Sequence, residues 1–253
     1  MSSLADASGS NESLPEADFG AERLPIAVEL AAFLERQIIV RRIAPGTRLV
    51  EAELCSRYRV SRSPLREALW QLEAGGLAVR RPHYGVRVAP MTLENLDHVF
   101  TCRVPLEALV AANVARRPRA ARRDIADDLQ GRLAAMDEAV AVNDPEAAFD
   151  ANVALTTRLH QACDNPVLRQ LLEQIDKPAL RYRHWAYTEQ PDMPRRALAG
   201  NRALITAIAE GLPDRAELAT AELVQDAWKL VRTVFAERGA APPAEEAPER
   251  FRR

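Results

Sequence analysis

The sequence predicts a mostly α-helical protein built from two differently patterned parts. Between residues 22 and 90, three short stretches space their apolar residues as helices do, and two shorter stretches then alternate apolar with other residues. Between residues 92 and 237, only helical spacing occurs. We therefore expect an N-terminal winged helix-turn-helix followed by a C-terminal all-α antiparallel helical bundle.

Charge is divided unevenly between the two parts. The 253 residues carry a formal net charge of −2, but residues 21–90 hold twelve arginines and seven glutamates, a net charge of +5. The rest of the chain therefore holds 22 basic and 29 acidic residues, a net charge of −7. A basic segment joined to an acidic one is expected when only one of the two meets the phosphates of a nucleic acid.

The sequence argues against a disulfide-stapled, zinc-binding or membrane protein. Cys55, Cys102 and Cys163 are odd in number and far apart, so neither a disulfide framework nor a zinc site is predicted. No apolar run approaches the roughly 18 residues of a membrane-spanning helix. Because the N-terminus is acidic and Ser-rich, no secretory signal is predicted, and we expect a soluble, cytoplasmic protein without a membrane partner.

The ends of the chain differ in composition from what lies between them. Residues 1–20 and 239–253 have too few apolar residues to pack and are expected to be disordered tails. Residues 21–90 are expected to form the winged helix-turn-helix domain, and residues 91–238 the helical domain.

Three helices are predicted in the first part. The first is indicated by apolar residues at every fourth position, and it ends before the Pro45-Gly46 turn. These apolar residues are Ile26, Leu30, Leu34 and Ile38. The second helix covers about residues 51–58, and the Arg59-Val60 turn leads from it into the third. The third helix has one apolar face, formed by Leu65, Ala68, Leu69 and Leu72.

The third helix also carries two arginines on another face. Arg62 and Arg66 lie four residues apart. Ser61 or Ser63 can cap the first turn, where Pro64 is tolerated. Arginine can donate two hydrogen bonds to guanine in the major groove, and serine can bind a phosphate. The pattern therefore suits a DNA-reading helix; taken alone, it also fits an ordinary amphipathic helix with a solvated basic face.

Two short strands follow and form the predicted wing. Residues 77–79 and 86–88 alternate apolar and other residues, and they bracket a turn that contains Pro82 and Gly85. The wing carries four side chains suited to backbone phosphates or the minor groove: Arg80, Arg81, His83 and Arg87.

A long ungapped motif runs through this part of the chain. It comprises Pro45-Gly46-Thr47-Arg48-Leu49, Glu51, Leu54, the ten residues from Val60 to Leu69, Leu72, Gly76-Leu77 and Gly85-Val86. With this motif, residues 34–88 resemble the DNA-binding domain of the GntR family of bacterial transcription regulators. The resemblance implies that double-stranded DNA is contacted by Arg62 and Arg66 of the third helix and by the tip of the wing. The expected DNA-binding residues are Arg48, Ser61, Arg62, Ser63, Arg66, His83, Tyr84 and Gly85, although the family's wing often has a second glycine where this chain has His83-Tyr84.

The second part is predicted to hold six or seven helices with short connections. Thr92 opens the first, and Pro105 is expected to interrupt it. The others are expected at about residues 106–116, 119–142, 145–163, 166–187, 195–210 and 214–237. Asp144-Pro145 and Pro213-Asp214 act as start signals, and Gly211 acts as a stop.

Three short motifs in this part match a second domain type. They are Arg103-Val104-Pro105-Leu106-Glu107, Asn165-Pro166-Val167-Leu168, and the group Ala207-Ile208, Gly211 and Ala216. With them, the second part resembles the FCD-type (FadR-like) effector domain. Most such domains bind a divalent metal through one aspartate and three histidines, whose positions are taken here by Asn152, Thr156, Asn201 and Leu223. Because none of these is a carboxylate or an imidazole, we expect no metal and no cofactor.

Polar groups nevertheless remain at the positions where relatives bind metal. Asn152 and Thr156 lie one turn apart on one helix face, and His160 lies one turn further. We expect a small-molecule effector to be bound directly, aided by a cationic and aromatic cluster at residues 181–185. The expected effector-binding residues are Asn152, Thr156, Asn201, Arg103 and His160. The alternative is that these are hydrogen-bonded core residues, surface residues or dimer-interface residues.

The two resemblances predict a ligand-responsive bacterial transcription regulator, expected to be a repressor. We expect it to bind a palindromic operator as a homodimer and to respond to a small metabolite, an organic acid being one candidate. The sequence contains no Gly-rich phosphate loop, nucleophile elbow or Cys/His pairing, so no catalytic residues and no enzyme are expected. Because the metal positions are replaced, a second reading is a constitutive DNA-binding protein whose helical domain only dimerises.

Overall fold

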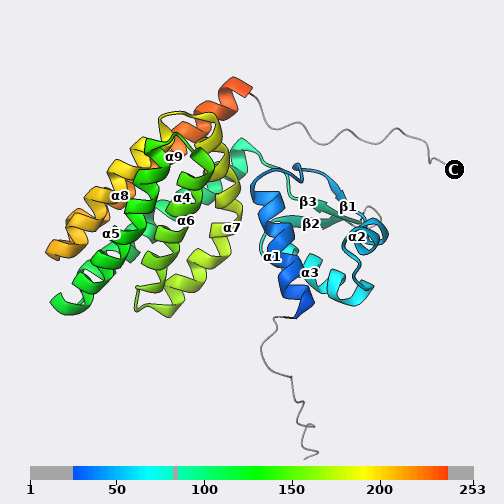
Figure 1. The fold of residues 1–253 in the computed structure, drawn as a ribbon, viewed down its shortest axis with the longest axis horizontal. Coiled ribbons are helices and arrows are strands. Elements are labelled where there is room, and N and C mark those ends of the chain that lie inside the picture. The colour runs from blue at the N-terminus through cyan, green and yellow to red at the C-terminus, as the bar shows by residue number, and fades with distance from the viewer. Residues whose placement is uncertain (1–24, 82–84, 239–253) are drawn as a thin grey trace, which may run out of the picture.

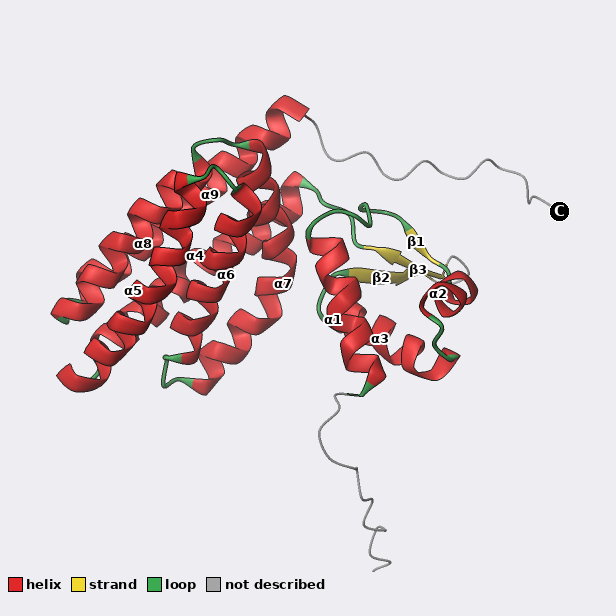
Figure 2. Cartoon of the chain, in the orientation of Figure 1, coloured by secondary structure: helices red, strands yellow, loops and turns green. Residues whose placement is uncertain are grey.

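A computed structural model describes residues 25–81 and 85–238 of the chain. The predicted tails, residues 1–20 and 239–253, lie outside the described residues, and so do His83 and Tyr84 at the predicted wing tip. The described residues form nine helices and one small sheet (Figure 2). All strands of that sheet belong to the N-terminal part. The predicted fold class, a mostly α-helical protein, is confirmed.

Three helices and a three-stranded sheet form the N-terminal part (Figure 1). The helices are α1 (Ile26–Ile39), α2 (Glu51–Tyr58) and α3 (Arg62–Ala74), and the strands are β1 (Arg48–Leu49), β2 (Ala78–Arg81) and β3 (Gly85–Val88). The sheet is antiparallel, in the order β1-β3-β2. Arg59 ends α2 in the left-handed backbone conformation, with φ of 54°, and so closes the tight turn into α3.

The apolar face predicted for α3 is confirmed. Leu65, Ala68, Leu69 and Leu72 are each at most 1% exposed, and they share a core with α1. Burying this face leaves the opposite face of α3 to solvent. Of the four apolar residues that indicate α1, Leu30, Leu34 and Ile38 are buried, whereas Ile26 is 59% exposed. Ile26 is the first residue of α1, and the buried stripe of that helix begins one residue later, at Ala27.

The sequence pattern does not predict β1, because two residues are too few to show an alternation of apolar and polar side chains. Arg48 of β1 pairs with Arg87 of β3, and Leu49 pairs with Val86. Gly85 begins β3 with φ of 76°, a conformation that glycine adopts without strain. Arg48 therefore belongs to the same sheet as β2 and β3, although it precedes α3 in the sequence.

Six helices form the C-terminal part within the described residues: α4 (Leu93–Ala115), α5 (Arg119–Ala141), α6 (Pro145–Gln161), α7 (Pro166–Glu189), α8 (Met193–Glu210) and α9 (Pro213–Arg238). Their connections are short, and α4 packs along α9 and against α7. The side chains of Thr92, Asp144 and Asn165 accept hydrogen bonds from backbone N–H groups at the starts of α4, α6 and α7. No helix within the described residues is long and apolar enough to cross a membrane.

Pro105 does not interrupt α4, contrary to the prediction. A proline inside a helix removes one backbone donor and tends to bend the helix. Here residues on both sides of it, such as Phe100 and Val110, are fully buried in the core of the bundle, and this packing holds α4 as one helix. Pro178 lies inside α7 in the same way.

The N-terminal part and the bundle meet along α7. Lys177 of α7 donates a hydrogen bond to Glu35 of α1 over 2.6 Å. Arg181 of α7 donates over 2.7 Å to the carbonyl oxygen of Ala89, which lies in the linker between β3 and α4. One helix of the bundle therefore contacts both the first helix of the N-terminal part and the chain that leads out of that part.

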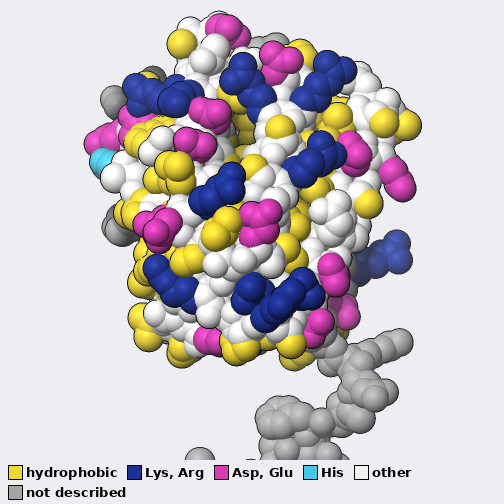
Figure 3. Space-filling model, turned by 90° about the vertical axis from the view of Figure 1, so that its left-hand side faces the viewer, with side chains coloured by type: hydrophobic (Ala, Val, Ile, Leu, Met, Phe, Trp, Pro, Cys, Tyr) yellow, Lys and Arg dark blue, Asp and Glu magenta, His cyan; other side chains and the backbone are white. Residues whose placement is uncertain are grey.

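The side of the bundle that lies furthest from the strands in Figure 1 carries mixed charge. Figure 3 shows Lys and Arg side chains interspersed there with Asp and Glu side chains. Because alternating charges give little net field, this side is not expected to attract DNA phosphates. The basic N-terminal part is the better candidate for that role.

Candidate functional site

The first half of α3 presents polar side chains to solvent. Ser61, Arg62, Ser63 and Arg66 are all exposed. Ser61 is the residue that caps α3, but its side chain makes no capping hydrogen bond. Its hydroxyl and the first N–H groups of the helix are thus available to an outside acceptor such as a phosphate.

Arg66 is held in place by α2. Its Nε donates to Oε2 of Glu51 over 2.9 Å, and the Arg66 side chain remains 63% exposed. The Nη groups of Arg66 make no hydrogen bond within the described residues. Arg62 forms no ion pair with a carboxylate of the described residues. Both guanidinium groups can therefore reach a DNA duplex laid against α3.

On the wing, the structure brings Arg48 and Gly85 together. Both are exposed, and a β-carbon placed on Gly85 would lie 3.8 Å from Nε of Arg48. Arg80 of β2 is engaged by Glu73 of α3, to which it donates two hydrogen bonds, over 3.1 and 2.6 Å. Arg48 is thus a basic residue at the base of the wing loop, and so is the exposed Arg81, which pairs with Gly85 in the β2–β3 register. His83 and Tyr84, the other two predicted wing contacts, lie outside the described residues.

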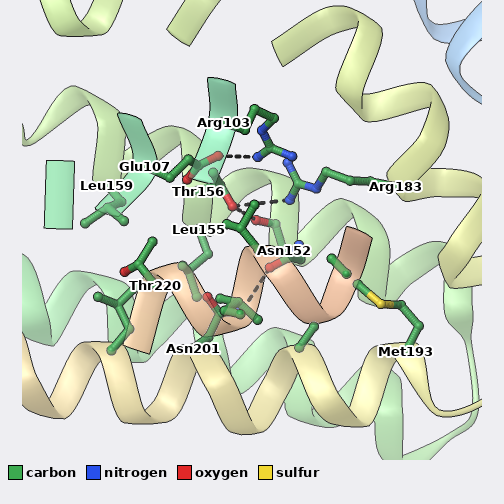
Figure 4. A pocket seen from close by; sticks show the side chains of 15 residues that line it. Arg103, Glu107, Asn152, Leu155, Thr156, Leu159, Arg183, Met193, Asn201 and Thr220 are labelled. Atoms are coloured by element: carbon green, nitrogen blue, oxygen red, sulfur yellow. Dashed lines mark hydrogen bonds and ion pairs between the residues drawn. The ribbon is translucent and has the colours of Figure 1, made fainter. Parts of the chain in front are cut away.

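A cavity of about 40 Å³ lies inside the bundle, between α4, α6, α7, α8 and α9. Apolar side chains that line it include Leu204 and, labelled in Figure 4, Leu155 and Met193. The polar residues that line it are Arg103, Glu107, Asn152, Thr156, Arg183, Asn201 and Thr220. Four of the five predicted effector-binding residues thus meet in one cavity. The fifth, His160, does not line the cavity but contacts Glu107, which does.

The residues at the expected metal positions bond to one another instead. Nδ2 of Asn201 donates to Oδ1 of Asn152 over 2.9 Å, and the hydroxyl of Thr156 donates to the backbone carbonyl of Asn152 over 2.9 Å. Leu223 at the fourth position has no donor atom in its side chain. Within residues 25–81 and 85–238, no group of three or more His, Cys, Asp or Glu side chains is placed to hold a metal ion. These residues therefore do not fit the divalent metal that the resemblance would imply.

A buried network of charges adjoins the cavity. Arg103 and Glu107, one turn apart on α4, form an ion pair in which both side chains are less than 5% exposed. His160 lies between two carboxylates, with its Nε2 3.1 Å from Oε2 of Glu107 and its Nδ1 3.3 Å from Oδ2 of Asp176. Asp176 also lies 3.7 Å from Nη2 of Arg103. The network links α4, α6 and α7.

The charge states of this network follow from its geometry. Burial alone would lower the pKa of His160, but Glu107 and Asp176 outweigh burial and raise the pKa to about 9. Burial would likewise raise the pKa of Glu107, but Arg103 and His160 outweigh it and hold that pKa below its ordinary value. At neutral pH, His160 is therefore an imidazolium and Glu107 a carboxylate.

Arg183 has a different environment from Arg103. It is 5% exposed, and its one hydrogen bond within the described residues runs from Nη2 to the hydroxyl of Thr156, over 3.3 Å. No described carboxylate lies within ion-pair distance of it. Burial, and next the charge of Arg103, lower the pKa of Arg183. In Figure 4 the two guanidinium groups point toward each other at one end of the cavity.

The residues of the predicted cluster at 181–185 contact different parts of the protein. Arg183 lines the cavity. Arg181 binds the linker, and the hydroxyl of Tyr182 donates to the carbonyl oxygen of Thr92 at the start of α4. Trp185 stacks under Arg41, whose guanidinium carbon lies 5.0 Å from the ring centre. One arginine of the cluster therefore faces the cavity, Arg181 and Trp185 contact the linker and Arg41 of the N-terminal part, and His184 packs on Phe149 of α6.

Known protein families match both parts of the chain. Residues 26–88 match the model of the bacterial regulatory proteins of the gntR family. Residues 98–226 match the model of the FCD domain. The second match alone covers about half of the chain.

Individual proteins agree with these family matches. Over 220 residues, the chain is 29% identical to the galactonate operon transcriptional repressor of Escherichia coli (strain K12), which covers 79% of this chain and 94% of that protein. A shorter match, 36% identical over 76 residues, relates it to the uncharacterized HTH-type transcriptional regulator YdhC of Bacillus subtilis (strain 168), covering 30% of this chain and 34% of that protein. The solved structure of E. coli McbR/YncC has the same fold, with a TM-score of 0.72 at 20% identity over 84% of this chain and 100% of that one. These family models and relatives describe transcription regulators and not enzymes.

Proposed function

Because the chain belongs to the GntR family of bacterial transcription regulators and carries an FCD domain, we propose that it is a metabolite-responsive repressor that binds a palindromic operator as a homodimer. The observation that carries this proposal is the combination of an exposed Arg62/Arg66 face on α3 with a polar cavity in the bundle. The proposal places double-stranded DNA at α3 and the wing, and it places the effector in the cavity. Such a regulator acts in the cytoplasm, where the DNA is.

The proposed DNA contacts follow from what α3 and β1 leave exposed. Arg62 and Arg66 are positioned to read base edges or bind desolvated phosphates in the major groove. Ser61 and Ser63 at the helix start suit phosphate oxygens, and Arg48 suits the backbone beside the wing. The domain boundaries proposed for this division of labour are residues 21–90 for DNA binding and residues 91–238 for the effector and the dimer.

A homodimer is proposed because one winged helix buries little surface on DNA. Two copies related by a two-fold axis double the contacts over two half-sites, which is why a palindromic operator accompanies a dimeric regulator. The helical domain is the part proposed to hold the two copies together. Light scattering over a range of protein concentrations tests this, with and without DNA; a mass of one chain throughout would contradict the dimer.

The proposed effector is a small organic acid bound without a metal. Support comes from the positive charge of Arg103 and Arg183 at one end of the cavity and from the lack of metal-ligand side chains at the expected positions. One relative is named as the repressor of a galactonate operon, and galactonate is an organic acid. Asn152, Thr156, Asn201 and Arg103 are proposed to contact the effector. His160 lies outside the cavity lining and is proposed to act indirectly, by pairing with Glu107.

The competing function is constitutive DNA binding by a protein whose bundle only dimerises. The small size of the cavity favours it. An operator selected from a random duplex pool by the ligand-free protein separates the two functions. The regulator predicts that a panel of small organic acids includes one that changes operator affinity, whereas the constitutive protein predicts no change with any of them.

A further inference from the structure

Arg183 is a buried cation with no carboxylate within ion-pair distance among the described residues. Glu107 and Asp176 act on it from further away, and both are already engaged by Arg103 and His160. Within the described residues, its guanidinium makes one hydrogen bond, from Nη2 to Thr156, out of the five that such a group can donate. Burying a charge is costly unless it is paired, so this arrangement disfavours the ligand-free protein. Such a cost is understandable where a ligand supplies the missing anion.

We propose that Arg183 binds a single carboxylate group and that the cavity takes a small hydroxy-monocarboxylate as its ligand. This inference rests on the proposed function and specifies the charge, size and receptor residue of the effector. The Arg183 guanidinium would then bind the anion in place of the divalent metal that most FCD-type domains hold.

The position of Arg103 explains why Arg183 is the receptor. The two guanidinium groups face each other, but Arg103 already has Glu107 in an ion pair and Asp176 at 3.7 Å. A carboxylate entering the cavity therefore meets one arginine that is already neutralised and one that is not. Arg183 can offer it two parallel N–H groups, the strongest arrangement for binding a carboxylate.

The count of charges sets the ligand at one negative charge. The three cations around this end of the cavity are Arg103, Arg183 and protonated His160, and the two anions are Glu107 and Asp176. The network therefore has a net charge of +1, which one carboxylate cancels. A second carboxylate in the same space would be buried without a partner, at a large cost in free energy.

The cavity also limits the size of the ligand. A volume of about 40 Å³ holds on the order of three or four water-sized groups. That is close to the size of a two- or three-carbon acid. Asn201, whose Nδ2 is used by Asn152, retains its amide oxygen as an acceptor for a hydroxyl on such an acid.

Three small compounds test the charge requirement directly. Glycolate carries one carboxylate and one hydroxyl, glycolamide is its neutral counterpart, and oxalate is a dianion of similar size. Calorimetric titration of the full-length, chelator-treated protein is expected to show one glycolate per chain, and binding at least about tenfold weaker for glycolamide and for oxalate. Equal binding of oxalate or glycolamide would overturn the proposal, and so would the absence of glycolate binding.

Two variants of Arg183 and one control test the receptor residue. Arg183→Gln is expected to weaken glycolate binding about 10- to 100-fold, and Arg183→Lys is expected to recover part of that loss because it restores the charge without the fork. Arg196→Gln is the matched control, because Arg196 is an exposed arginine of α8, outside the lining of this cavity. Its glycolate affinity is expected to equal that of the unmodified protein. Retained glycolate binding in Arg183→Gln would overturn the assignment.

The thermal stability of the ligand-free variants gives a second readout. If Arg183 lacks a counter-charge, Arg183→Gln should raise the melting temperature of the ligand-free protein, by about 2–4 °C. A melting temperature that falls in this variant would show that the guanidinium is stabilising and not poised for a ligand. Operator binding by the ligand-free, unmodified protein is measured in parallel. If the protein binds an operator but not glycolate, the monocarboxylate site is wrong and the DNA-binding function stands. If the protein selects no operator from the duplex pool, the proposed function itself is contradicted.

Discussion

Asp176 and Lys177 are consecutive residues of α7, and their side chains contact different parts of the protein. Oδ2 of Asp176 lies 3.3 Å from Nδ1 of His160, in the charge network beside the cavity. Nζ of Lys177 lies 2.6 Å from Oε2 of Glu35, on the first helix of the DNA-binding part. A movement of α7 caused by a ligand at Arg183 would therefore be transmitted to α1 without any intermediate element.

Breaking the contact between α7 and α1 should weaken the coupling between ligand and DNA. We predict that Lys177→Gln reduces the factor by which glycolate changes operator affinity, while the calorimetric affinity for glycolate stays the same. Exchanging the two charges, with Glu35→Lys and Lys177→Glu together, should restore part of the factor. Lys229→Gln is the control, because Lys229 pairs with Asp226 on the exposed surface of α9. An unchanged factor in Lys177→Gln would show that this contact is not part of the coupling.

Removing either exposed arginine of α3 should weaken specific DNA binding. Arg62→Ala and Arg66→Ala are each predicted to cost roughly 1–3 kcal/mol of operator binding free energy. Helical content should be unchanged in circular dichroism, because neither residue belongs to the buried Leu65 face. Wild-type operator affinity in both variants would contradict the assignment of α3 as the recognition helix.

His160 should make stability fall at alkaline pH. Its pKa is raised from an ordinary 6.5 to about 9 by Glu107 and Asp176, against the opposing effect of burial. The folded protein therefore holds this proton more tightly than the unfolded chain, so the stabilisation is complete below pH 6.5 and is lost as the pH rises through about 9. We predict that the melting temperature declines across this window and that the decline is flatter in His160→Gln. Parallel pH profiles in the two proteins would rule out His160 as the titrating group.

Metal should have no specific effect on this protein. Because Asn152, Thr156, Asn201 and Leu223 offer no carboxylate or imidazole, we predict that a chelator leaves the melting temperature unchanged. Added zinc, nickel or manganese should not raise it through a specific site. Stoichiometric metal in protein purified without added metal, lost in Asn152→Leu or Asn201→Leu, would contradict this account.

Much of the fold follows from the spacing of apolar residues. The buried face of α3 is predicted because Leu65, Leu69 and Leu72 repeat at helical intervals, and the structure buries all three. Strand β1 is not predicted, because the pairing of Arg48 with Arg87 depends on a partner 39 positions away in the sequence and not on local pattern. Pro105 is misread as a break because packing of α4 outweighs the loss of one backbone hydrogen bond.

The cavity is only partly predictable for a related reason. Asn152 and Thr156 share a face because they lie four residues apart, so spacing alone brings them together. Residues 181–187 are all buried, so they show no polar side that would indicate which residue faces the cavity. The contrast between Arg181, which binds the linker, and Arg183, which lines the cavity, therefore emerges only from the packing of α7 between two partners.

Operator affinity with and without glycolate, measured for the unmodified protein and for Arg183→Gln, tests the central claim most directly. The operator is a duplex selected by the ligand-free protein, and fluorescence anisotropy reports its binding. The account predicts that saturating glycolate lowers the operator affinity of the unmodified protein by about 5- to 150-fold. It also predicts that Arg183→Gln binds the same operator normally and does not respond. An unmodified protein that ignores glycolate, or an Arg183→Gln variant that responds equally, would contradict it.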